Sequence, residues 1–111
     1  MTQSLLTIVA SPALEETLAD WMLARDDIPG FTSIRVDGHN TDTLQMSLTE
    51  QVRGRRHQVM YQAHLDTAHV EAILDDLHSD FSGARIHYWL TPIIRSGNLT
   101  SAPPAGELPD S

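Results

Sequence analysis

The sequence predicts one α+β domain in which two helices cover one face of a four-stranded antiparallel sheet. Apolar residues alternate with polar ones along several short segments, which is typical of half-buried strands. In two other segments they recur at every third or fourth position, which is typical of amphipathic helices. These segments follow one another in the order β-α-β-β-α-β. Two right-handed crossovers and one hairpin then give the ferredoxin-like arrangement.

The first strand and helix lie close together at the start of the chain. The β-branched apolar run Ser4–Ala10 predicts a strand. Ser11 is placed to cap a helix, and Pro12 suits the first helical position, where its missing N–H costs nothing. The helix is expected to end near Asp27, because a Pro-Gly pair follows. Its inner stripe comprises Leu14, Leu18, Trp21 and Met22.

Two strands are expected in the middle of the chain, over Phe31–Gly38 and His57–Leu65. In the second of these, apolar residues alternate with mixed polar residues. The apolar set is Val59, Tyr61, Ala63 and Leu65, and the other set is Gln58, Met60, Gln62 and His64. We expect the apolar set to face the helices. The mixed set then lies on an open sheet face that meets water or neighbouring subunits.

The second helix and the last strand complete the predicted domain, which spans residues 1–96. Asp66 or Thr67 is expected to cap the helix. Its inner stripe is Val70, Ile73, Leu74, Leu77 and Phe81. A strand follows over Ala84–Leu90, extending through Ile94, with Pro92 interrupting it or placing it at a sheet edge. Residues 97–111 are rich in Gly, Ser and Pro, which predicts a disordered tail.

Composition excludes several classes of function. The chain has no Cys, which rules out disulfides, thiolate nucleophiles and sulfur-ligated zinc. Fifteen acidic residues against seven basic ones give a net charge of −8, so nucleic acid is not an expected partner. The apolar run near the start is too short for a signal segment, and no run approaches a membrane span. We expect a cytoplasmic protein without membrane insertion.

The connection between the two middle strands, residues 39–56, is the most informative segment. It is far longer than the roughly two to five residues of an ordinary hairpin loop. Arg53, Arg55 and Arg56 concentrate positive charge near its end. In so acidic a chain this cluster suggests binding of an anion or an acidic partner. Pairing with acidic groups of the same or a neighbouring subunit is the alternative.

Histidines provide the second candidate chemistry. Asp37 and His39 would share a strand face if the strand continued that far, and His57 would lie nearby if the connection folded back. These three residues form a candidate metal site, although no metal-binding motif such as His-Glu-x-x-His is present. We expect the remaining histidines to be packing or hydrogen-bonding residues and not metal ligands. No catalytic motif is present either, so a non-enzymatic role is expected, with an orphan ferredoxin-like enzyme as an alternative.

Four segments resemble a small PII-like family of unassigned function from proteobacteria. They are Gly30–Ser33, Val36–His39, Ser47–Arg56 and His87–Trp89. The resemblance implies a homotrimer whose sheets face inward and whose long loop, the T-loop, binds or blocks a membrane transporter or an enzyme. Members are often encoded beside heavy-metal efflux systems, which implies a role in metal homeostasis. By this analogy, His39 would sense a ligand or metal, while Arg53, Arg55 and Arg56 would hold an anion or partner in an inter-subunit cleft.

The sequence also departs from the PII pattern. Nitrogen-regulatory PII proteins bind ATP through a Gly-rich, Lys-bearing turn after the second helix, whereas Ser79–Ala84 has one Gly and no Lys. We therefore expect a divalent or monovalent transition metal ion as effector ahead of an adenine nucleotide. Three hypotheses remain: an effector-binding regulator of a transporter, a metal-binding tolerance protein of CutA-like type, and the orphan enzyme.

Overall fold

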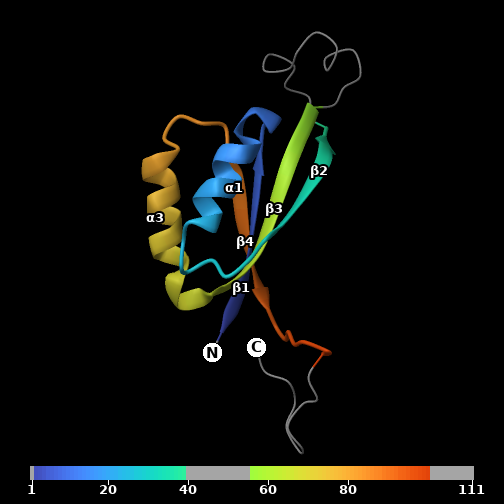
Figure 1. Cartoon of the computed structure of the whole chain (residues 1–111), viewed down its shortest axis with the longest axis vertical. Coiled ribbons are helices and arrows are strands. Elements are labelled where there is room, and N and C mark those ends of the chain that lie inside the picture. Colours follow the sequence, from blue (N-terminus) through green and yellow to red (C-terminus); the bar gives the residue numbers. More distant parts are fainter. Residues whose placement is uncertain (1, 40–55, 101–111) are drawn as a thin grey trace, which may run out of the picture.

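The computed structural model describes residues 2–39 and 56–100. Its elements are β1 (Gln3–Ala10), the 3-10 turn η1 (Pro12–Leu14), α1 (Glu15–Leu23), β2 (Thr32–Gly38), β3 (Arg56–Asp66), the 3-10 turn η3 (Thr67–His69), α3 (Val70–Asp80) and β4 (His87–Ile93). The strands pair in the order β2-β3-β1-β4, and every neighbouring pair is antiparallel. Both α-helices lie on one side of the sheet (Figure 1). The predicted ferredoxin-like fold is therefore confirmed.

The hydrophobic core lies between the sheet and the two helices. Alternation along β3 buries the apolar set that the sequence predicts to face the helices. The helices contribute the matching stripes, and β1 contributes the central strand of the core. The main members are Leu6, Ile8 and Ala10 of β1, Val59, Tyr61, Ala63 and Leu65 of β3, Leu18 and Met22 of α1, and Val70, Ile73, Leu74 and Leu77 of α3.

The opposite sheet face carries the mixed set of side chains. Thr7 on β1 is fully buried there, in register with Gln62 on one side and Trp89 on the other. Gln62 Nε2 donates a 3.4 Å hydrogen bond to Thr7 Oγ1. Ile34 and Trp89 remain 46% and 39% exposed. No helix of the described chain covers this face, so Ile34 and Trp89 are exposed apolar side chains on it.

The two helices begin differently from each other. The Ser11 side chain makes no capping hydrogen bond, contrary to prediction, and its carbonyl accepts a bond from the Leu14 N–H at 3.0 Å. This bond closes the tight turn η1, so α1 starts after the turn. The Asp66 side chain accepts a hydrogen bond from the Ala68 N–H at 3.0 Å. Asp66 therefore caps the turn η3, which leads directly into α3, while α3 itself begins after His69 without a side-chain cap.

The first helix ends at Leu23, before the predicted end at Asp27. Arg25 forms two hydrogen bonds to the Asp27 carboxylate, each 2.8 Å long. Residues two apart point to different sides of an α-helix, so this pair requires the chain to leave the helix. The turn also directs Ile28 into the core, where its side chain is 5% exposed. Local pairing and burial of one apolar residue therefore shorten the helix.

The last strand begins at His87, later than the predicted Ala84. A turn precedes it: the Ala84 N–H bonds to the Phe81 carbonyl, and Gly83 adopts a φ of 84°. Pro92 lies within β4, opposite Ser4, and β4 is an edge of the sheet. An edge strand tolerates proline because one side of it forms no ladder bonds. The edge position expected from Pro92 is confirmed.

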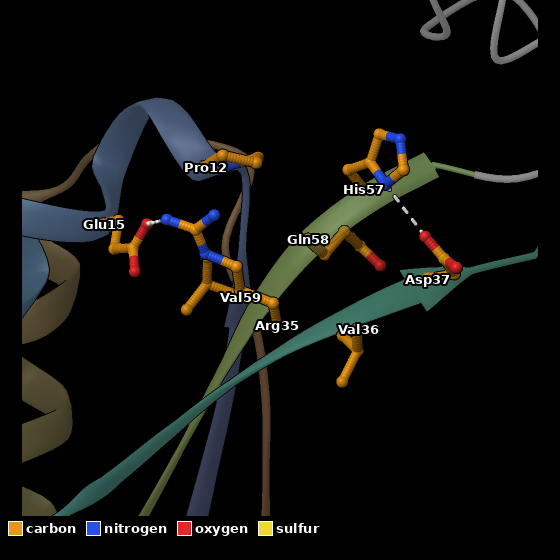
Figure 2. A pocket seen from close by; sticks show the side chains of 8 residues that line it. All are labelled: Pro12, Glu15, Arg35, Val36, Asp37, His57, Gln58 and Val59. Atoms are coloured by element: carbon orange, nitrogen blue, oxygen red, sulfur yellow. Dashed lines mark hydrogen bonds and ion pairs between the residues drawn. The ribbon is translucent and has the colours of Figure 1, made fainter.

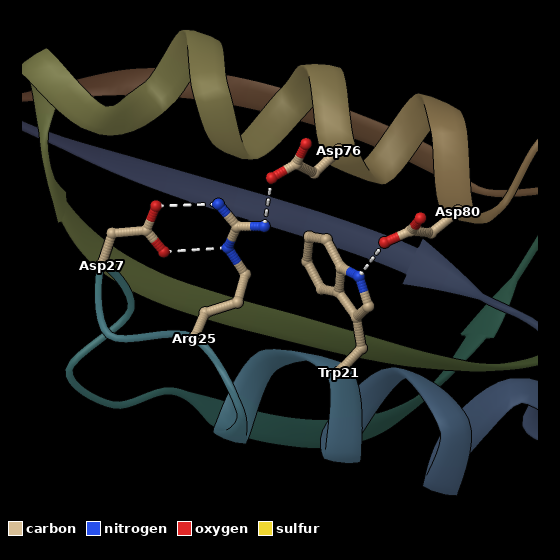
Figure 3. Close-up of polar contacts among 5 residues, drawn as sticks. All are labelled: Trp21, Arg25, Asp27, Asp76 and Asp80. Carbon is tan, nitrogen blue, oxygen red and sulfur yellow. Dashed lines mark hydrogen bonds and ion pairs between the residues drawn. The ribbon is translucent and has the colours of Figure 1, made fainter.

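A polar clamp joins the two helices (Figure 3). Arg25 donates to Asp27 and, at 2.7 Å, to Asp76 on α3. Its guanidinium lies 4.9 Å from the centre of the Trp21 ring, and Trp21 Nε1 donates to Asp80 at 2.8 Å. These contacts fix the end of α1 and the turn that follows it against α3. Within the described ranges no helix is long and apolar enough to cross a bilayer.

Candidate functional site

The antiparallel topology gathers several chain segments at one end of the sheet. β1 and β2 end there, while β3 and β4 begin there, because Gly38 pairs with Arg56 and Val9 pairs with His87. The turn η1 leaves β1 at the same end. Residues far apart in the sequence therefore surround the point where the 39–56 connection leaves and rejoins the sheet.

A first cleft of about 670 Å³ opens beside the ends of β2 and β3. We call it the first chamber; it is lined by Pro12, Glu15, Arg35, Val36, Asp37, His57, Gln58 and Val59. Four of these residues are ionisable, and Figure 2 shows them as two pairs, Arg35 with Glu15 and His57 with Asp37. The chamber therefore offers both acceptors and donors to a polar ligand.

The structure brings Asp37 and His57 together across paired strands. Asp37 on β2 and His57 on β3 are in register, and His57 Nδ1 lies 2.9 Å from Asp37 Oδ1. Both side chains are partly open to solvent. His39 follows the end of β2 and is exposed, so it does not lie on the strand as a shared face requires. Across 2–39 and 56–100, no three His, Cys, Asp or Glu side chains converge as metal ligands.

Glu15 is held from two strands at the start of α1. Arg35 of β2 donates to Glu15 Oε1 at 3.2 Å, and the Tyr61 hydroxyl of β3 donates to the Glu15 carbonyl at 2.7 Å. Burial raises the pKa of the Tyr61 hydroxyl, and the negative charge of Glu15 adds to that effect. Tyr61 therefore remains a neutral donor, and its hydrogen bond fixes the backbone of Glu15 beside the first chamber.

A second cleft, of about 420 Å³, adjoins the first. We call it the second chamber; it is lined by Ser11, Pro12, Ala13, Leu14, Arg56, His57, Gln58 and Arg85. Its described lining contains two arginines and a histidine but no carboxylate. In a chain with net charge −8, such a surface is a local positive site. It can bind a carboxylate or phosphate through charge-assisted hydrogen bonds.

The predicted site residues divide into three groups. Arg56 and His57 line the second chamber, and Asp37 and His57 line the first. Arg53 and Arg55 lie outside the described residues. Sequence reasoning missed Glu15, Arg35 and Arg85. Arg85 could have been found from topology, since the start of β4 must lie beside the start of β3 when both pair with β1 in the antiparallel sense.

Comparison with known proteins identifies the family. A family described as "Protein of unknown function (DUF3240)" matches residues 1–100. The chain belongs to the DUF3240 family. Among curated proteins, no match to this DUF3240 protein is found.

Solved structures with the same fold include both DUF3240 and PII-like proteins. A DUF3240 protein from Shewanella baltica OS155 has a TM-score of 0.72 at 20% identity, covering 89% of this chain and 98% of its own. The PII-like protein CPII from Thiomonas intermedia K12, bound to ADP, AMP and bicarbonate, gives 0.63 at 18% identity, covering 84% and 91%. A GlnK–ATP complex from Bacillus subtilis gives 0.62 at 18% identity, covering 89% and 90%. The chain therefore has the PII-like fold.

Proposed function

We propose that this DUF3240 protein is a non-enzymatic, PII-like signalling protein that binds a small anionic effector at the base of the 39–56 connection. One observation carries the proposal. Arg56, His57 and Arg85 line one chamber from two strand starts, and the described lining includes no carboxylate. A guanidinium binds carboxylate or phosphate oxygens in a fixed, often two-pronged geometry, so two of them give selective anion binding.

The position of the chamber suits a signalling role. It lies at the point where the 39–56 connection rejoins β3 at Arg56, so an anion bound there would contact the end of the connection. An effector that binds two conformations of a segment with different affinity shifts their populations. The anions named for CPII and GlnK support an anionic effector over the metal ion that the sequence suggests.

The proposal extends to assembly and partners. We infer a cytoplasmic homotrimer that buries its open sheet faces, because Ile34 and Trp89 leave that face partly apolar. The 39–56 connection would then act on a partner, which the family resemblance suggests is a membrane transporter in heavy-metal efflux. His39, which follows the end of β2, would link effector binding to that connection.

Calorimetric titration tests the anion site. The purified protein is titrated with ADP, AMP, bicarbonate and inorganic phosphate. We expect at least one to bind, and Arg85→Ala and Arg56→Ala each to weaken that binding by about tenfold or more, since a charge-assisted hydrogen bond is worth about 1.5–3 kcal/mol. Arg95→Ala, which changes an exposed arginine outside both chambers, is the matched control and should bind as the wild type does. Absence of binding by all four anions, or unchanged affinity in both chamber variants, would contradict the proposal.

A further inference from the structure

The two chambers form one continuous site. Pro12, His57 and Gln58 line both of them, so one wall of the first chamber is also a wall of the second. Their volumes, about 670 and 420 Å³, leave room for a ligand that extends beyond a single phosphate or carboxylate. A ligand anchored in the second chamber can therefore reach the groups of the first.

The described linings of the two chambers differ in charge. In the first, the carboxylates of Glu15 and Asp37 lie with one guanidinium, that of Arg35. In the second, the described charged groups are the guanidiniums of Arg56 and Arg85. His57 lines both chambers and contacts Asp37. A ligand that is anionic along its whole length meets two carboxylates in the first chamber, whereas a ligand with a cationic end is attracted to them.

We propose that the effector is a zwitterion, with an anionic group in the second chamber and an ammonium group beside Asp37 and Glu15 in the first. This inference rests on the proposed function. A carboxylate has about four lone-pair sites, so Asp37 can accept from a ligand ammonium group in addition to its partners within the protein, of which His57 is one. Glu15 likewise accepts from Arg35 at Oε1, 3.2 Å away, and its carboxylate also faces the chamber (Figure 2).

The inference also gives a role to the two contacts that hold Glu15, one from Tyr61 and one from Arg35. The backbone carbonyl of Glu15 is held by Tyr61 from the core, which fixes the start of α1 against β3, and its carboxylate is oriented by the contact with Arg35 of β2. An acceptor that is already in place costs a ligand less ordering entropy. A simple anion would gain nothing from this arrangement, whereas an ammonium group would.

Matched ligand pairs test the inference. The protein is titrated with aminoalkyl phosphates that have two to six methylene groups, and with the alkyl phosphates in which a methyl group replaces the ammonium. At one or more chain lengths we expect the aminoalkyl phosphate to bind about tenfold more tightly than its methyl counterpart, the value of one charge-assisted hydrogen bond. Asp37→Asn, which keeps an acceptor for His57, should remove most of that advantage. Glu15→Gln provides a second test, and the exposed Asp75→Asn on α3 is the control.

The outcomes separate this inference from the proposed function. If both members of each pair bind equally and Arg85→Ala weakens both, the anion site stands and the zwitterion is wrong. The inference also fails if the advantage of the ammonium group survives in both Asp37→Asn and Glu15→Gln. It fails too if added Mg²⁺ makes the methyl counterparts bind as tightly as the aminoalkyl phosphates, which would place a metal cation in the first chamber. If no phosphate binds at any length, the result counts against both. Thermal unfolding of each variant establishes that it is folded.

Discussion

Arg25 shows how one side chain can hold two helices in place. Its guanidinium bonds to Asp27 in its own turn and to Asp76 on α3, and its face lies over Trp21. The side chains of Arg25 and Asp27 are 16% and 23% exposed, so their bonds form largely out of water, whereas Asp76 is 56% exposed. We expect Arg25→Ala to lower the free energy of unfolding by about 2 kcal/mol. Arg25→Lys should recover part of the loss, because lysine keeps the charge and loses the two-pronged contact.

Urea denaturation measures both variants against Arg95→Ala, an exposed arginine outside the clamp, which should stay within about 0.5 kcal/mol of the wild type. Equal stability of Arg25→Ala and Arg95→Ala would show that the clamp does not stabilise the fold.

The same clamp predicts a dependence on pH. The hydrogen bond from Arg25, aided by its positive charge, holds the pKa of the Asp27 carboxyl below its ordinary value of 3.8. A carboxylate with a lowered pKa in the folded state stabilises the protein above its unfolded pKa, and that contribution is lost as the pH falls through the folded value. Asp27→Asn should therefore cost about 1 kcal/mol at pH 7 and progressively less below pH 3.8.

The measurement is the difference in unfolding free energy between wild type and Asp27→Asn, taken by urea denaturation at a series of pH values. A difference that stays constant from pH 7 to pH 2.5 would contradict the assignment. Asp75→Asn, on the exposed side of α3, should show a small difference throughout.

The candidate site could be predicted from the sequence only in part. The sequence brings His57 near Asp37 only on the condition that the connection folds back, and pairing of β2 with β3 brings His57 Nδ1 within 2.9 Å of Asp37 Oδ1. Arg35 and Glu15 belong to different elements, and their contact depends on how α1 lies across β2. No local pattern encodes that packing. Arg85 follows a turn whose length the sequence does not define, so its place could be derived only from the topology.

At the scale of elements, the alternation of apolar and polar residues predicted which face of β3 packs in the core. β3 alternates strictly, and a shift by one residue would turn Tyr61 and Leu65 away from the core, so its faces were predictable. The end of α1 was not, because it depends on the Arg25–Asp27 pair and on the insertion of Ile28. Two features could end this helix, the Arg25–Asp27 pair and the later Pro29. The helix ends at Leu23, next to the Arg25–Asp27 pair and well before Pro29.

The turn between α3 and β4 provides an element-scale prediction. Gly83 has a φ of 84°, and a Cβ there would meet no atom within 4 Å. The cost of Gly83→Ala is therefore backbone strain alone, about 1–2 kcal/mol. Gly30 is likewise open to a Cβ but lacks a positive φ. Gly30→Ala is thus the matched control, expected to be neutral or stabilising by up to about 1 kcal/mol.

Thermal and urea unfolding of the two alanine variants make the comparison. If Gly83→Ala were as stable as Gly30→Ala, the left-handed turn would not be needed before β4. The same turn precedes Arg85, so Gly83→Ala should also weaken anion binding in the second chamber if the position of Arg85 depends on it.

At the scale of the whole molecule, the two faces of the sheet differ in what covers them. One face is closed by α1 and α3 and forms the core. The other carries Ile34, Trp89 and the buried Thr7, which is hydrogen-bonded to the partly buried Gln62, and no helix of the described chain covers it. The chambers open at the end of the sheet, next to the edge strand β2. Assembly through the apolar face would leave that end accessible to an effector.

This arrangement predicts a self-associated protein whose assembly depends on Ile34. A charge buried in an interface without a partner is costly, so Ile34→Asp should dissociate the proposed trimer into 12.3 kDa chains. Leu23→Asp makes the same chemical change on α1, at a side chain that is 70% exposed on the helical side, and should leave the mass unaltered. Light scattering on eluting protein at micromolar concentration gives the masses, and circular dichroism establishes that each variant is folded. A wild-type mass of one chain, or a trimeric Ile34→Asp, would show that the open face serves something other than self-association.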